Sequence, residues 1–484
     1  MSQQRNGSKG GRRVMMNPSP PIVRTGAHPP TRGDKFNRMT EGELSRWRRR
    51  NELIKRIATL ALLGALATGC GNGNKNGAEP GAAAQTEPVT LLFYTAQNGN
   101  YAKEENFESD IGQFIKAKFP HIKLEHIHTA KGSEYQDLIG AGKIPDIVLD
   151  SSSNVTSAII RNGLQHDMTA LLQKQKFDLN RIDPALLQVV RNYGDGKLNG
   201  LPFLGSNYLM FYNKDVFDKF GVPYPRDGMT WDETYELAKK LTRTDGGVQY
   251  NGFQADPGLL LKYNPRSLGF LDAKEDKPEV ATEAWKQYVA HVKRFYDIPN
   301  NPVSNVDNFP KGQYALAVHV AEKVIGWPQA NPNLNWDVVA APVFKDAPGV
   351  GLQSNFYSLF VTGQSKHKDE AAAVIAHLLS DEVQTQLSKK GLITPLVGKD
   401  VQKAFGDNMP ELKGKNVQAV YANKYAPPPP ARANGLTFVD GSSKMRAAFV
   451  DMMKTNEDIN TVLRKAEDAI KQDIAAAKAL QTNK

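Results

Sequence analysis

The sequence predicts an α/β fold in which a parallel sheet carries helices on both faces. Two observations indicate this class. From residue 89 onward, short β-rich runs alternate with longer segments whose apolar residues repeat at helical spacing. The run Asp146-Ile-Val-Leu149 is apolar after its first residue, as is typical of a strand covered on both faces. Strands separated by helices favour a parallel sheet, in which ligands bind at the carboxyl ends of the strands.

The first half of this region contains the clearest alternation. Residues 89–94 (VTLLFY) predict a strand, and the spacing of Ile111, Phe114, Ile115 and Phe119 predicts a helix over 110–119. The next expected elements are a strand at 121–128, a short helix at 134–141, a buried strand at 146–149 and helices at 156–161 and 168–175.

The second half begins with an extended apolar strand within residues 201–215. Thr230 and Glu233 form a capping-box pattern that predicts a helix through Leu241. Trp231 is expected to be a core residue of this helix, with a sugar-stacking platform as the alternative. Pro427–Pro430 is a rigid loop, either a connector or part of a cleft rim. The remaining expected elements are strands at 310–319, 337–343 and 356–362 and helices at 368–379, 401–405, 441–453 and 459–480.

The formal charge of +10 is confined to the start of the chain. Residues 1–69 hold 14 Lys and Arg against 4 Asp and Glu, whereas residues 70–484 hold 47 of each. The body therefore has no basic stripe that would neutralise phosphates, and we expect it to bind no nucleic acid.

The single cysteine, Cys70, follows a secretory signal. Basic residues precede the apolar run 57–66, which is too short to span a bilayer, and small residues fill 67–69. The segment resembles a bacterial lipoprotein signal, in which the cysteine is lipidated and becomes the mature N-terminus. Ala67 stands where that signal usually has Leu. The alternative is an ordinary signal peptide followed by a chance cysteine.

Residues 1–69 are thus expected to be a signal peptide with a basic N-terminal extension. Residues 1–45 are either removed with the signal or reflect a start site placed too early, with Met39 a candidate true start. Residues 70–88 are expected to be the lipidated Cys70 and a flexible tether, because nothing in this stretch can build a core. This places the protein at the extracellular face of the cell membrane, anchored by lipid.

Several segments of the body are similar to one known family. In order, they are 144–150 (IPDIVLD), 200–202 (GLP), 211–221 (FYNKDVFDKFG), 230–241 (TWDETYELAKKL), 311–318 (KGQYALAV) and 369–384 (DEAAAVIAHLLSDEVQ). Together they resemble the bacterial extracellular solute-binding proteins, family one, the sugar-type receptors of ATP-driven importers. The resemblance covers roughly residues 89–395.

The resemblance implies a two-lobed periplasmic-binding-protein-like fold of type II, with lobes joined by crossing strands and the ligand between them. By analogy the N-terminal lobe spans 89–205 plus 345–382, and the C-terminal lobe spans 206–344 plus 383–484. Hinge closure on binding is expected.

The resemblance also implies candidate ligand contacts. The loop after the 144–150 strand lines the cleft in this family, and its short polar side chains suit a hydroxylated ligand; an ordinary polar β–α loop is the alternative. Trp327 is either a stacking face for a sugar or a core residue. The candidates are Tyr94, Gln97, Asp150, Ser151, Ser153, Asn154, Ser206, Asn207, Tyr208, Glu322, Trp327, Gln353, Asn355 and Tyr357.

The sequence shows no catalytic or metal-binding signature such as His-Glu-x-x-His, Gly-x-Ser-x-Gly or a phosphate-cradling Gly-rich loop. His121, His126 and His128 share no single face of their expected strand, so a surface strand is favoured over a metal site.

We therefore expect a monomeric lipoprotein without a cofactor or metal. It captures a carbohydrate, an oligosaccharide rather than a single sugar, and delivers it to an ABC transporter permease. A surface-anchored carbohydrate-active enzyme and a structural or adhesive surface lipoprotein are the rival interpretations.

Overall fold

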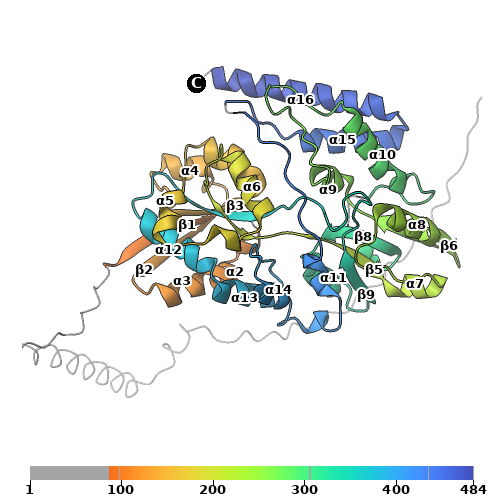
Figure 1. The fold of residues 1–484 in the computed structure, drawn as a ribbon, viewed down its shortest axis with the longest axis horizontal. Coiled ribbons are helices and arrows are strands. Elements are labelled where there is room, and N and C mark those ends of the chain that lie inside the picture. The colour runs from red at the N-terminus through yellow and green to blue at the C-terminus, as the bar shows by residue number, and fades with distance from the viewer. Residues whose placement is uncertain (1–86, 97–98, 305–306, 434, 483–484) are drawn as a thin grey trace, which may run out of the picture. The chain divides into compact units, whose positions relative to one another are not determined.

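The computed structural model describes residues 87–96, 99–304, 307–433 and 435–482. The expected signal, Cys70, nearly all of the tether and the candidate Gln97 lie outside the described residues. The described residues belong to one structural unit of the chain and contain two five-stranded sheets (Figure 1). No helix among them is long and apolar enough to cross a lipid bilayer.

The first sheet is mixed. Its strands, in spatial order, are β2 (Ile122–His128), β1 (Val89–Thr95), β3 (Ile147–Ser151), β10 (Tyr357–Val361) and β4 (Leu201–Leu204). β1 pairs in parallel with β2 and β3, as the sequence predicts. β10 is antiparallel to β3 and β4, which corrects the expectation of a wholly parallel sheet. The reason is that β10 enters this sheet from the other lobe rather than through a helical crossover.

Helices cover the first sheet, and its core is built from Leu91, Phe93, Ile147 and Leu149 together with the apolar faces of these helices. The helix expected at 110–119 begins earlier, because the chain is already helical at Glu104 and passes through a π-helical turn. The helices are α2 (Glu104–Phe107), α3 (Gln113–Lys118), α4 (Tyr135–Gly140), α5 (Thr169–Lys174), α6 (Pro184–Tyr193), α12 (Lys368–Leu378), α13 (Asp381–Lys389) and α14 (Lys399–Lys403).

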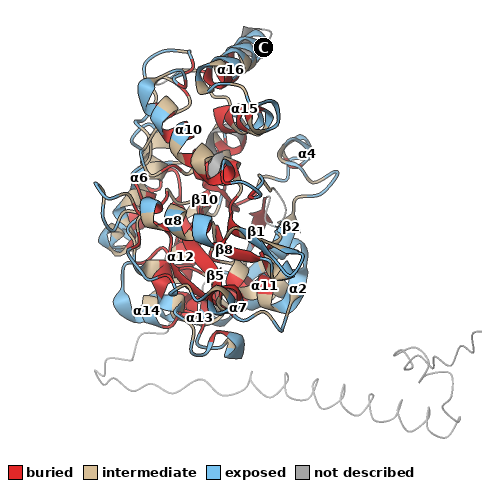
Figure 2. Ribbon diagram, turned by 90° about the vertical axis from the view of Figure 1, so that its right-hand side faces the viewer, coloured by how far each residue is buried: buried red, intermediate tan, exposed pale blue. Residues whose placement is uncertain are grey.

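The second sheet contains, in spatial order, β6 (Arg243–Asp245), β7 (Val248–Gln254), β8 (Tyr314–Val320), β5 (Tyr208–Asn213) and β9 (Trp336–Ala340). β5 is antiparallel to both of its neighbours, whereas β7 and β8 are parallel. Figure 2 shows β5 and β8 buried beneath helices whose outer faces are exposed.

Seven helices of the described residues accompany the second sheet. They are α7 (Lys214–Phe220), α8 (Trp231–Leu241), α9 (Pro257–Lys262), α10 (Glu283–Tyr296), α11 (Lys323–Ala330), α15 (Gly441–Thr455) and α16 (Ile459–Thr482). The capping box of α8 is confirmed: Glu233 N donates to Thr230 Oγ1 at 3.2 Å, and Thr230 N donates to Glu233 Oε2 at 2.7 Å. Trp231 is 3% exposed and packs edge-on against Phe253 and Phe295, so its expected place in the core is confirmed.

The chain crosses between the two sheets at residues 205–207 and again between β9 and β10. The single strand expected within 201–215 is therefore two strands, β4 and β5, one in each sheet. The family resemblance implies that residues from 383 onward belong to the C-terminal lobe. Val383 and Leu387 of α13, Leu396 and Val401 instead pack into the core of the first sheet, because α13 follows α12 directly through its Ser380 cap.

Candidate functional site

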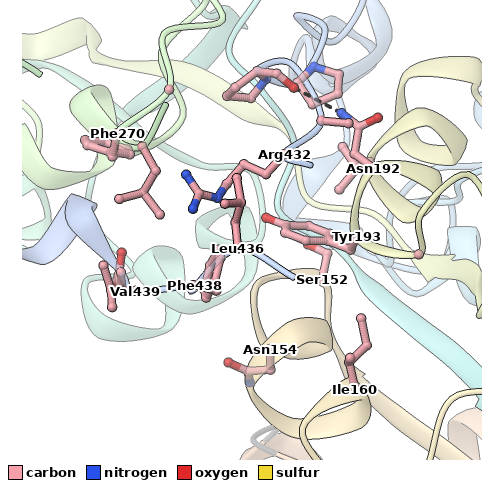
Figure 3. A pocket seen from close by; sticks show the side chains of 18 of the residues that line it. Ser152, Asn154, Ile160, Asn192, Tyr193, Phe270, Arg432, Leu436, Phe438 and Val439 are labelled. Carbon is pink, nitrogen blue, oxygen red and sulfur yellow. Dashed lines mark hydrogen bonds between the residues drawn. The ribbon is translucent and has the colours of Figure 1, made fainter. Parts of the chain in front are cut away.

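A cavity of about 1040 Å³ lies between the two lobes. The first lobe lines it with residues that follow β3 and with the end of α6. The second lobe lines it with residues 262–263, 269–271, 428–433, 435–436 and 438–442 and with part of α16. The crossing segment between β9 and β10 contributes Gln353, Ser354 and Asn355. Figure 3 shows side chains from both lobes converging on this space.

The loop after β3 brings Ser152 and Asn154 to the cavity on a short 3-10 helix, Ser152–Asn154, at the carboxyl end of a strand. The side chain of Asp150, the residue two before Ser152, holds this loop in place through hydrogen bonds. Its buried carboxylate accepts hydrogen bonds from Tyr135 Oη at 2.7 Å, from Asn154 Nδ2 at 3.0 Å and from Ser151 N at 2.7 Å. Burial raises the pKa of Asp150 above its ordinary value, although these hydrogen bonds act in the opposite direction.

The end of α6 adds two residues that sequence reasoning missed. Asn192 Nδ2 donates to Pro429 O at 3.0 Å, and the Tyr193 ring meets Phe438 edge-on with 6.4 Å between centroids. Both contacts join the first lobe to the second. Asn192 and Tyr193 end an amphipathic helix, and their sequence carries no signal of this role. Burial, followed by the charge of Asp440, raises the pKa of Tyr193.

Residues 427–433 and 435–440, hereafter the strap, form much of the opposite side of the cavity. Asp276 holds the strap to the second lobe by accepting from Arg432 Nη2 at 3.1 Å and from Thr437 N at 2.7 Å; it also pairs with Lys478 of α16 at 3.0 Å. Burial acts to raise the pKa of Asp276, but the pairing with Lys478 and the hydrogen bonds from Thr437 outweigh it and lower the pKa. The structure thus places part of the proline loop 427–430 in the cavity wall.

A second group of candidates lies at the crossing strands, beside the residues that line the cavity. Ser206 Oγ donates to Glu322 Oε2 at 3.2 Å, and Ser354 Oγ donates to the carbonyl of Ser206 at 2.8 Å. Burial raises the pKa of Glu322 to about 7, even though the Ser206 hydrogen bond favours the charged form. The pKa of Tyr357 is raised by burial and then by the charges of Glu322 and Asp150, which lie on opposite lobes.

Ser151 connects the two groups of candidates. Its Oγ donates to Asn355 Oδ1 at 3.3 Å, so the loop after β3 contacts the crossing segment. Of the residues predicted from sequence, Asn154, Gln353 and Asn355 line the cavity. The backbone of Ser153 lies on the same short helix, and its side chain is outside the described part of the structure.

Four other candidates lie in the protein interior. Tyr94 is buried, and its Oη contacts Thr129 Oγ1 at 2.7 Å and donates to the carbonyl of Ser133 at 3.0 Å. Asn207 Nδ2 donates to the carbonyl of Val420 at 2.6 Å, while its Oδ1 accepts from Tyr208 N at 2.8 Å. Both ends of the Asn207 amide are therefore engaged in holding the crossing strand.

Trp327 and Tyr208 complete this group. The Trp327 ring packs against Phe211 and Phe309, with centroids 4.7 and 5.0 Å away, so it occupies the core position that was the alternative to a sugar-stacking face. Tyr208 is buried with its ring 5.7 Å from that of Tyr263, which lines the cavity.

The histidines of β2 have local packing partners. His126 stacks on Phe107 with 3.6 Å between ring centroids, and its Nδ1 lies 2.6 Å from Glu104 Oε2. Thr95 Oγ1 contacts both His126 and His128, at 2.9 and 3.2 Å. These contacts place the two rings on one side of the strand, as its alternation predicts.

The described lining of the cavity is balanced in charge. Among the described residues, the lining contains four cationic side chains and four carboxylates: Arg161, Lys197, Lys262, Arg432, Asp167, Asp195, Asp440 and Asp473. Several of these groups already have partners: Arg432 contacts Asp276, and Asp473 pairs with Lys444 at 3.1 Å. The arrangement offers hydrogen-bonding groups and aromatic rings rather than a net charge.

Comparison with known proteins identifies the family to which this chain belongs. Residues 98–385 match the bacterial extracellular solute-binding proteins, and the chain belongs to this family. A protein of Brucella abortus strain 2308 that is named as a binding protein is 24% identical over 347 residues, which are 67% of this chain and 79% of that protein. The sn-glycerol-3-phosphate-binding periplasmic protein of Brucella suis biovar 1 is 29% identical over 196 residues, 38% of this chain and 41% of that protein.

Solved structures share the whole two-lobed architecture. An ABC substrate-binding protein from Listeria monocytogenes in complex with cycloalternan is 19% identical with a TM-score of 0.62, over 80% of this chain and 100% of that one. The sugar-binding protein MalE of Xanthomonas citri is 16% identical with a TM-score of 0.65, over 82% of this chain and 100% of that one. The expected type II periplasmic-binding-protein fold is thereby confirmed. The family is one of binding proteins and not of enzymes.

Proposed function

We propose that this solute-binding protein captures a neutral oligosaccharide in the cleft and delivers it to the permease of an ABC importer. The observation that carries the proposal is the cavity of about 1040 Å³ that both lobes line. Sites for small molecules typically measure roughly 300–1,000 Å³, so this one is large enough for several sugar rings. Ser152, Asn154 and Asn355 offer hydrogen bonds to hydroxyls, and Tyr193 and Tyr263 offer ring faces.

The charge of the lining favours a sugar over a phosphate ester, the other ligand class suggested by the names of relatives. A phosphate needs cations or backbone N–H groups that point at it. Here Arg432 is engaged by Asp276 and by the carbonyl of Asp272, and the lining carries as many carboxylates as cations. A neutral ligand is compatible with this balance.

We also propose that the protein works as a monomer tethered to the outer face of the membrane through lipid on Cys70. The support is the position of the chain's single cysteine directly after the apolar signal. A structural or adhesive role is the remaining rival, and it predicts that no small ligand stabilises the protein.

A binding screen tests the ligand class. Protein lacking residues 1–70 is heated with mono- and oligosaccharides and, as a separate arm, with sn-glycerol 3-phosphate. The cognate sugar at a hundredfold excess over its Kd stabilises the folded state by about 2.7 kcal/mol and raises Tm accordingly. Stabilisation by the phosphate ester and by no sugar would overturn the assignment.

A fractionation experiment tests the anchor. The Cys70→Ser variant of the full chain, expressed in a bacterium that processes lipoproteins, is expected in the soluble fraction or the medium, whereas the wild type sediments with membranes. Membrane retention of the variant would show that Cys70 is not the anchor.

A further inference from the structure

One side of the cleft is lined by side chains that cannot hydrogen-bond to a sugar. Phe270, Leu271, Leu436, Phe438 and Val439, hereafter the apolar wall, all line the cavity from the second lobe. Leu271 belongs to the hydrophobic core of that lobe, and Phe270, Phe438 and Val439 are partly buried against the same core. In Figure 3, Phe438 and Val439 lie beside Leu436, the Arg432 side chain lies between Leu436 and Phe270, and Asn154 and Ile160 of the first lobe lie lower in the view.

The apolar wall is held in place by the protein itself. The Phe270 ring packs on Trp285 with 4.9 Å between centroids, and Trp285 Nε1 donates to the carbonyl of Gly269 at 2.9 Å. Thr437, which lies between Leu436 and Phe438, is 2% exposed and donates both its N–H and its hydroxyl to Asp276. The wall is therefore preformed and does not depend on a ligand to assemble.

The charged groups that adjoin the apolar wall are committed within the second lobe. Arg432 pairs with Asp276, and Asp473 pairs with Lys444. Asp440 caps α15 by accepting from Ser442 N at 3.0 Å. A sugar hydroxyl pressed against this wall would lose water without gaining a hydrogen bond, and this loss is unfavourable. The branched side chains of Leu271, Leu436 and Val439 also lack the flat face on which a sugar ring stacks. The two aromatic rings of the wall already contact aromatic side chains of the protein, since Phe270 packs on Trp285 and Phe438 meets Tyr193 edge-on.

We propose that the ligand is a glycoside that carries an uncharged apolar group, and that this group lies against the apolar wall. The sugar portion then lies on the polar side, near Ser152, Asn154 and Asn355. The inference rests on the proposed function and narrows its ligand class from oligosaccharides in general to sugars with an aryl or alkyl substituent. The cavity of about 1040 Å³ has room for both portions.

Calorimetric titration with matched pairs of ligands tests this. Maltose, cellobiose, lactose, xylobiose and mannobiose are each titrated as the free sugar, as the p-nitrophenyl glycoside and as the octyl glycoside. For at least one sugar, a substituted form is expected to bind about tenfold more tightly than the free form, which corresponds to about 1.4 kcal/mol. The Leu436→Ser/Val439→Ser double variant should lose this gain and retain the affinity for the free sugar.

The matched control is Val248→Ser, which removes a valine that is 41% exposed on β7 of the same lobe and does not line the cavity. It should keep the full gain. If free sugars bind and both substituted forms bind no more tightly, the inference is wrong and the proposed function stands. If the double variant weakens free and substituted sugars equally, the apolar wall does not select the substituent. If no sugar binds in any form, the proposed function and this inference both fail.

Discussion

The two sides of the cleft are built in different ways. The first lobe presents short polar side chains on a loop at the end of β3, and the buried carboxylate of Asp150 fixes that loop. The second lobe presents the strap, a segment without regular secondary structure that Asp276 fastens to the lobe. The first side thus follows the general rule for α/β sheets. The second is held by side-chain and backbone contacts of an irregular segment, among which those of Asp276 join two strap residues to the lobe.

The two sides of the cleft therefore contribute different kinds of contact. The loop after β3 supplies hydrogen-bonding groups, and the strap supplies apolar surface together with the contacts that join the lobes. Asn192 and Tyr193 of the first lobe both meet the strap. Changes in the strap should therefore affect closure of the cleft as well as binding. Substitutions in the strap, in the core of a lobe and at the crossing strands should therefore change different properties of the protein.

The largest effect is expected inside a lobe, away from the cleft. Trp231→Ala removes a side chain that is packed against Phe253 and Phe295. Loss of this buried ring should reduce the free energy of unfolding by about 3–5 kcal/mol, measured by urea denaturation. Ligand affinity, measured where the variant is still folded, should be unchanged. Loss of binding in the folded Trp231→Ala protein would mean that the ring belongs to the site.

The next effect concerns the crossing strands, where Glu322 accepts a hydrogen bond from Ser206 and burial raises its pKa to about 7. The unfolded chain releases this proton near pH 4.5, so the folded state binds more protons between about pH 4.5 and 7. Stability contributed by Glu322 is thus present below this window and falls as the pH rises through it. Because the side chain is partly accessible, the loss should be on the order of 1–2 kcal/mol.

Comparison with Glu322→Gln isolates this group, because Gln keeps an acceptor for Ser206 and has no proton to lose. Unfolding free energies of the wild type and the variant should diverge as the pH rises, with the variant relatively more stable at pH 8. If the unfolding free energies of the two proteins change in parallel from pH 4 to 8, the pKa of Glu322 is not raised in the folded state.

An effect of similar size is expected from release of the strap. Asp276→Ala leaves Thr437 N without its acceptor and removes the carboxylate partner of Arg432, which still donates to the carbonyls of Asp272 and Thr437. The loss should cost about 1–2 kcal/mol of stability. Proteolysis within 427–440 should become faster. Asp297→Ala, which removes an exposed carboxylate paired with Lys293 on α10, is the control and should be nearly neutral. Equal protease resistance in both variants would show that Asp276 does not hold the strap.

The sequence predicted the elements with strong local signals. The apolar run at Ile147–Leu149 and the Thr230–Glu233 capping box appear as expected, because both depend on neighbouring residues only. The break between β4 and β5 was missed, since Leu201–Asp215 reads as one apolar strand until the sheet to which each part pairs is known.

The candidate site was predicted less completely for the same reason. Asn207 lies within a predicted strand and Tyr94 ends one, yet their polar atoms are satisfied by Val420, Thr129 and Ser133 from distant parts of the chain. The residues of the strap line the cleft because distant partners hold them there, among them Asp276, 161 positions before Thr437. Tertiary partners of this kind leave no periodic pattern in the sequence.

The smallest and most specific effect is expected where the two sides of the cleft meet. Asn192 Nδ2 donates to Pro429 O, a direct hydrogen bond between α6 and the strap. Asn192→Ala removes it, and a single hydrogen bond of this kind contributes about 0.5–1.5 kcal/mol. If the bond belongs only to the closed form, its loss shifts the equilibrium toward the open form by that amount. Small-angle scattering should then report a larger radius of gyration for ligand-free Asn192→Ala than for the wild type, and saturating ligand should restore the smaller value. Asn180→Ala, on the same lobe and bonded only locally to Asp178 among the described contacts, should leave the scattering profile unchanged. Identical profiles for Asn192→Ala and the wild type, with and without ligand, would show that the strap does not couple the two lobes.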